Sequence, residues 1–218
     1  MTLLQAFLPW LDLSAVLLLA FALAGLVGRT TSGIFAAYAG QSLALAGILA
    51  LLGVGTGRWP LLALAAFTAL GKAWLVPRLL RRRLHRELLD RAAFGSYLSA
   101  PAAMLTAAVL LACSFILLPP AAAGGLHLLL VAGVTTLLFA LAAMSARREA
   151  LPQVLSFFLG ENGVIAAVAA LIYDFPFLPE LGLFLDLWLA ALVLGVLIRR
   201  MYERLGSTDV SRLNRLRG

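Results

Sequence analysis

Long apolar runs, each close to the length that crosses a lipid bilayer, follow one another along nearly the whole of this 218-residue chain. A membrane-spanning helix needs roughly 20 consecutive apolar residues. Charged residues make up only 12% of the sequence, against roughly a quarter in soluble domains. We therefore predict an all-α integral membrane protein with transmembrane helices at about seven places, namely 12–28, 33–53, 60–80, 97–118, 126–146, 152–173 and 178–200.

The positive charges lie almost entirely on one side of the predicted membrane. Of the 17 lysines and arginines, 15 fall on that side, Arg58 falls on the other, and Lys72 lies within a span. Cytoplasmic loops carry the excess of Lys and Arg in membrane proteins. We therefore expect a multi-pass protein of the cell's inner (plasma) membrane, with its N-terminus outside and its C-terminus in the cytoplasm. The same distribution favours contact with membrane lipid and argues against nucleic-acid binding.

Three ionisable residues fall inside the predicted spans, where a charge is costly and marks a functional site by default. Lys72 and Glu161 lie roughly 14–16 Å, and Asp186 roughly 20 Å, from the cytoplasmic ends of their helices. We predict that these residues form a proton path, with Gln41 and Asn162 as supporting polar groups at similar depths. The alternative is that Lys72 pairs with a carboxylate only to hold helices together.

An internal repeat organises the chain. Gly40-Gln41-Ser42 in the second helix corresponds to Gly160-Glu161-Asn162 in the sixth, and both units then turn through an aromatic-proline pair into a helix that ends in arginines. One extra helix between the units makes them parallel. The predicted parts are an N-terminal three-helix unit at 1–81, a basic loop and linking helix at 82–125, and a C-terminal three-helix unit with a cytoplasmic tail at 126–218.

Motifs for redox or group-transfer chemistry are missing from the sequence. It contains no glycine-rich phosphate loop, nucleophile triad or haem-ligating pair. A single cysteine, Cys113, can form neither a disulfide nor a thiolate metal centre within the chain. We expect no cofactor and no metal in this chain, and no enzymatic activity of the chain on its own.

At Phe158-Leu159-Gly160-Glu161-Asn162-Gly163, the last helix and the tail from Gly206 to Gly218, the sequence resembles the hydrogenase-4 component E family. The resemblance extends over essentially the whole length. The C-terminal three helices are also similar to the K subunit of respiratory complex I, which has two membrane-embedded glutamates. Glu161 stands in the place of the first and Asp186 in the place of the second, although Asp186 is an aspartate. In the N-terminal unit, Gln41 replaces the first carboxylate.

This resemblance implies a membrane-arm subunit of a complex-I-like respiratory complex of the group 4 hydrogenase type, which contributes to coupled proton or sodium translocation. Its partners would be antiporter-like membrane subunits and hydrogenase-like or dehydrogenase-like subunits. Two alternatives stay open: a subunit of a multisubunit cation/proton antiporter or a small stand-alone permease, and a structural spacer between membrane subunits.

Overall fold

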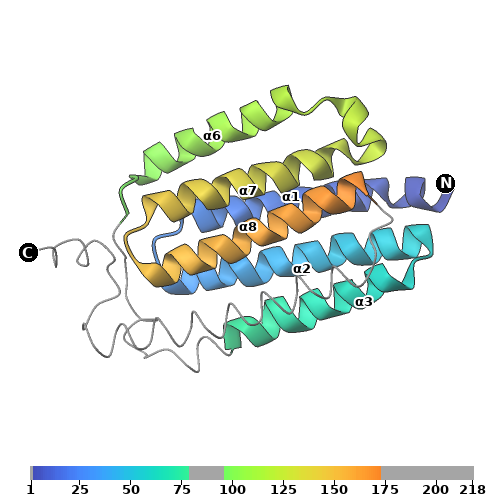
Figure 1. The fold of residues 1–218 in the computed structure, drawn as a ribbon, viewed down its shortest axis with the longest axis horizontal. Helices are drawn as coiled ribbons and strands as arrows, with labels where there is room; N and C mark the ends of the chain where they lie inside the picture. Colours follow the sequence, from blue (N-terminus) through green and yellow to red (C-terminus); the bar gives the residue numbers. More distant parts are fainter. Residues whose placement is uncertain (1, 79–95, 173–218) are drawn as a thin grey trace, which may run out of the picture.

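The structure is a computed structural model that describes residues 2–78 and 96–172, and these residues form a bundle of long helices (Figure 1). The helices are α1 (Thr2–Val27), α2 (Thr31–Thr56), α3 (Trp59–Phe67), α6 (Ala100–Leu117), α7 (His127–Ala146) and α8 (Ala150–Leu171). A π-helical segment, η1 (Thr68–Leu75), continues α3. Two short 3₁₀ turns, η2 (Pro120–Ala122) and η3 (Gly124–Leu126), precede α7. The described residues contain no β-strand, so the predicted all-α class is confirmed.

Six of the predicted spans correspond to helices that are long and apolar enough to cross a membrane. Helix α3 and segment η1 together make one of them, Trp59–Arg78. The predicted seventh span at 178–200 and nearly all of the predicted basic loop lie outside the described residues. The division into two parallel three-helix units therefore stays a prediction.

The first helix begins ten residues earlier than its predicted start at residue 12. It starts at Thr2 and includes Pro9, and its membrane candidate runs from Leu4 to Val27. Asp12, which lies at the start of the predicted span, is inside the helix and is half-buried. One carboxylate leaves the backbone hydrogen bonds intact, and a proline near a helix start removes only one of them.

Local capping explains where α2 begins and ends. The Thr30 hydroxyl accepts a hydrogen bond from the Gly33 N–H at 3.2 Å, which satisfies a free donor at the start of the helix. Gly57 ends the helix with φ of 70°, a left-handed conformation that glycine adopts without a steric penalty. The chain then reverses at once into α3, with Pro60 in its first turn.

Helices α1, α2, α7 and α8 form the centre of the bundle, with α3 along α2 at one edge and α6 along α7 at the other (Figure 1). The turns α1–α2 and α7–α8 lie at one end, and the turns α2–α3 and α6–α7 lie at the opposite end. Apolar side chains fill the central interface, including Leu18, Leu45, Leu49, Leu129 and Ala166. This packing places the middle of α8 between α7 and the pair α2–α3.

Candidate functional site

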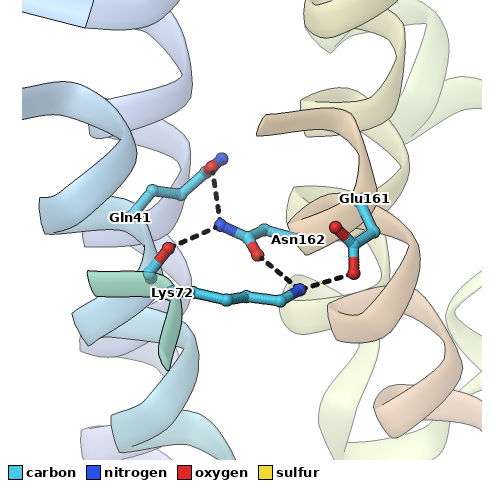
Figure 2. A network of polar contacts seen from close by, with 5 residues as sticks. Gln41, Lys72, Glu161 and Asn162 are labelled. Carbon is cyan, nitrogen blue, oxygen red and sulfur yellow. Dashed lines mark hydrogen bonds and ion pairs between the residues drawn. The ribbon is translucent and has the colours of Figure 1, made fainter. Parts of the chain in front are cut away.

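A lysine and a carboxylate meet in the middle of the helical bundle. Lys72 Nζ lies 2.6 Å from Glu161 Oε1, and Figure 2 shows the two side chains pointing toward one another. The Lys72 side chain is 1% exposed and that of Glu161 is 18% exposed. Both residues belong to helices that are candidates to cross the membrane. The pair therefore combines two opposite charges where an isolated charge would be costly.

The lysine is carried by the π-helical segment η1. The N–H of Val76 donates to the carbonyl of Gly71, five residues earlier, instead of the four-residue spacing of an α-helix. Thr68, Gly71 and Lys72 are the buried residues of this segment. Segments of this kind are rare and occur frequently at functional sites. The local winding of η1 thus sets the direction in which Lys72 leaves its helix.

Asn162 connects the charged pair to α2. Its Oδ1 accepts a hydrogen bond from Lys72 Nζ at 3.2 Å. Its Nδ2 donates to Gln41 Oε1 at 3.2 Å and to Ser42 Oγ at 3.0 Å. Figure 2 shows Asn162 between Gln41 on one side and Lys72 on the other. Together with the Lys72–Glu161 contact, these three hydrogen bonds make one continuous network across α2, η1 and α8.

The structure thus brings together four of the five residues that the sequence singled out. Lys72, Glu161, Gln41 and Asn162 share one network, although positions 41 and 162 are 121 residues apart. The fifth, Asp186, lies outside the described residues. Ser42, which the sequence reasoning noted only as part of a repeat motif, is a buried hydrogen-bond partner in this network.

Several polar atoms at or near the network have no hydrogen-bond partner within the part of the chain that the structure describes. They are the hydroxyl groups of Tyr38 and Thr68, Nε2 of Gln41 and Oε2 of Glu161. Tyr38 lies one helical turn before Ser42 on α2, and Thr68 lies one turn before Lys72. Buried polar groups usually have a partner, so these atoms are able to hydrogen-bond to additional polar groups.

The pair can exchange a proton directly. A nitrogen and an oxygen 2.6 Å apart are within hydrogen-bond reach, and a proton can pass from the ammonium to the carboxylate without movement of either helix. The result would be a neutral amine beside a neutral carboxylic acid. Among the described residues, no group of three His, Cys, Asp or Glu side chains is placed to hold a metal ion.

A second buried polar cluster lies at the end of the bundle where α7 turns into α8. Arg147 donates to the carbonyl of Pro152 at 3.0 Å and also to Ser156 Oγ and the carbonyl of Gly25. Burial lowers the pKa of Arg147 to about 10, so the guanidinium remains protonated at neutral pH. It lies near the C-terminal end of α1, where a positive charge is favourable.

The sequence reasoning counted Arg147 only as a topology-determining charge. Nothing in the sequence distinguishes it from its neighbour Arg148, which is exposed and stacks on the Tyr97 ring at 4.1 Å. The structure shows instead that Arg147 ties α1 to the start of α8.

Comparison with known proteins gives similarity over most of the chain. Hydrogenase-4 component E of Escherichia coli (strain K12) is 31% identical over 184 residues, which are 83% of this chain and 85% of that protein. The protein of the same name from Shigella flexneri matches to the same extent. An uncharacterized protein of Mycobacterium tuberculosis is 29% identical over 180 residues, or 81% of this chain and 82% of that protein. No family model matches the chain, and no solved structure does so either.

Proposed function

The chain belongs to the hydrogenase-4 component E family, and from this membership we propose that it is a membrane subunit of a hydrogenase complex that contributes to proton translocation. The relatives' name supports the hydrogenase assembly, and the six apolar helices support the membrane location. Antiporter-like membrane subunits and hydrogenase-like or dehydrogenase-like subunits are the proposed partners. Redox chemistry would belong to those partners.

One observation carries the proton role: the Lys72–Glu161 ion pair within the membrane-spanning part of the bundle. A buried pair of this kind contributes little net stability, because the cost of desolvating two charges offsets their attraction. Replacement of such a pair by apolar side chains of similar volume is often neutral or stabilising. Ion transfer requires titratable side chains at this position, whereas helix packing does not.

In the proposed step, the bond from one proton to Lys72 Nζ breaks and a bond to Glu161 Oε1 forms. The pair becomes neutral, with the lone pair left on Nζ. Glu161 then releases a proton from its carboxylic acid group to the next carrier, for which we propose Asp186. Lys72 is left as a neutral amine beside a carboxylate, and it regains the ammonium form when a new proton arrives.

The test is proton translocation in vesicles that carry the assembled complex, measured together with redox turnover and complex abundance. Glu161→Gln removes the titratable group and keeps the size of the side chain. The matched control is Glu149→Gln, the same chemical change at the N-cap of the same helix, outside its span. We expect Glu161→Gln to lower translocation per turnover by about a hundredfold or more, the scale of a positioned acid or base.

Unchanged translocation per turnover in Glu161→Gln would refute the proton role of the pair. Loss of the complex in Glu161→Gln that is not reversed in Lys72→Met/Glu161→Gln would show that the pair holds the helices together, as the structural alternative states. If translocation in the wild type follows sodium rather than pH, the transported ion is sodium and the proton step above is wrong.

A further inference from the structure

The direction of every hydrogen bond around Asn162 follows from the charge on Lys72. An ammonium group donates hydrogen bonds and cannot accept them. The atom of Asn162 that faces Lys72 Nζ at 3.2 Å must therefore be the carbonyl oxygen. The amide nitrogen then faces α2, where it donates to Gln41 Oε1 and Ser42 Oγ.

This arrangement leaves Gln41 in an unfavourable orientation. Its oxygen is used by Asn162, and its Nε2 meets no acceptor within the described residues. The side chain is completely buried. A buried donor without an acceptor costs roughly 1–3 kcal/mol. The protonated lysine thus holds the two amides in an order that is costly at Gln41.

The constraint disappears when Lys72 is a neutral amine beside the Glu161 carboxylate, because the single lone pair of the amine is then free to accept a hydrogen bond from Asn162. If both amides turn over, Asn162 Nδ2 faces Lys72, and Asn162 Oδ1 accepts from Gln41 Nε2. Ser42 can hydrogen-bond to Asn162 in either orientation of the amide, because a hydroxyl group both donates and accepts. Only side-chain rotation is needed, since the heavy-atom positions of an amide are nearly the same after a half turn.

We propose that Asn162 and Gln41 are positioning residues that form a two-state amide relay, which inverts once the Lys72–Glu161 pair has released its proton and so transmits the state of the pair to α2. The inference rests on the proposed proton role for its biological use, but its geometry can be tested separately. Ser42 serves as the common partner in both states. Within the described residues, the titratable group in contact with Lys72 is Glu161.

The test follows the infrared carbonyl band of Asn162 in the full-length chain, labelled with ¹³C-asparagine and reconstituted in lipid vesicles. The chain contains two asparagines, Asn162 and Asn214. Asn162→Leu identifies the band by its loss, and Asn214→Gln is the matched control that leaves it in place. Lys72→Met represents the uncharged lysine, and Lys72→Met/Glu161→Gln, which leaves no unpaired charge at the site, takes its place if Lys72→Met does not fold.

The relay predicts that Gln41 affects this band only when the charge at residue 72 is absent. Gln41→Leu should leave the band nearly unshifted in the wild-type background, where Oδ1 faces Lys72. In the Lys72→Met background, Gln41→Leu should shift the band, because Oδ1 then accepts from Gln41 Nε2. Equal shifts in both backgrounds, or none in either, would overturn the relay.

The outcome separates the relay from the proposed function. The relay signature is a band shift that Gln41→Leu causes only when residue 72 is uncharged. This signature together with unchanged translocation in Glu161→Gln would keep the inference and reject the proton role. Loss of translocation in Glu161→Gln without the signature would keep the proton role and reject the relay.

Discussion

Gly133 of α7 and Gly163 of α8 face each other at backbone contact. A Cβ atom added at Gly133 would lie 2.5 Å from the backbone N of Ala167, and one added at Gly163 would lie 2.7 Å from the carbonyl oxygen of Gly133. This contact sets the rotation of α8. Because successive residues of a helix are about 100° apart, Glu161 points away from α7 when Gly163 points toward it.

The first prediction concerns this contact. Gly163→Ala should push α7 and α8 apart at a cost of about 1–3 kcal/mol, as overpacking generally does. The control is Gly47→Ala, whose new Cβ would meet only Ser14 Oγ at 3.8 Å, an ordinary contact. The thermal stabilities of the two variants in detergent are compared by measuring, with size-exclusion chromatography, the folded protein that remains after heating. A Gly163→Ala protein as stable as Gly47→Ala would contradict the close packing.

The second prediction concerns the two partners of the ion pair. Lys72→Met leaves the Glu161 carboxylate buried without its donor, and removal of one partner of a buried pair typically costs about 3–5 kcal/mol. The double variant Lys72→Met/Glu161→Gln removes both charges. We expect the single variant to lower complex abundance and the double variant to restore it, as measured by blue-native electrophoresis.

Translocation should stay absent in the double variant even when its abundance recovers. Recovery of both properties would show that the pair is dispensable for transport. A double variant as scarce as the single one would mean that the two charges do not compensate one another.

The third prediction concerns the arginine at the α7–α8 turn. Arg147→Met removes the donors that reach the carbonyls of Gly25 and Pro152. The Pro152 carbonyl keeps its hydrogen bond from Ser156 Oγ, whereas loss of the donor to the Gly25 carbonyl leaves a buried acceptor unpaired at a cost of about 1–3 kcal/mol. Arg148→Met removes the same charge from the neighbouring exposed site, where a cation–π contact is worth about 0.5–1 kcal/mol. Thermal unfolding of the two variants should therefore differ clearly, with Arg147→Met the less stable. Similar unfolding temperatures would argue against a tie between α1 and α8.

The fourth prediction concerns orientation. Ser145 and Ala121 are both exposed and lie near opposite ends of α7. In a Cys113→Ala background, which has no other cysteine, Ser145→Cys should react with a membrane-impermeant maleimide only from the cytoplasmic side. Ala121→Cys should react only from the outside. The reverse pattern would show that the distribution of arginines does not set the orientation.

The sequence was sufficient for locating the six described spans because a lipid-crossing helix has a minimum apolar length that can be counted. The predicted start of the first span at Asp12 was wrong, because α1 continues past this carboxylate to Thr2. A carboxylate raises the cost of burial without breaking a helix, and the structure leaves Asp12 half-buried rather than enclosed.

The depth of each polar residue along its helix could be estimated from the sequence, but the direction in which its side chain points could not. If residue 72 is assumed to lie in a regular α-helix, each N–H bonds to the carbonyl four residues earlier. In segment η1 the spacing is five residues, so the direction of the Lys72 side chain differs from that expected for an α-helix. The contact between Lys72 and Glu161 therefore depends on a local winding that apolar composition does not reveal. Likewise, the partnership of Asn162 with Gln41 depends on how closely α2 and α8 pack.

The separation of 89 residues between Lys72 and Glu161 also imposes an order on biosynthesis. At the usual pace of translation, roughly 5–20 residues per second, the ribosome finishes α3 roughly 5–20 seconds before it reaches Glu161. During that interval the nascent chain carries an intramembrane lysine whose carboxylate has not yet been made. Until α8 arrives, the span Trp59–Arg78 therefore carries a cost of roughly 2.5–3.5 kcal/mol for its central lysine, and the ion pair relieves this cost only when the sixth described span is complete.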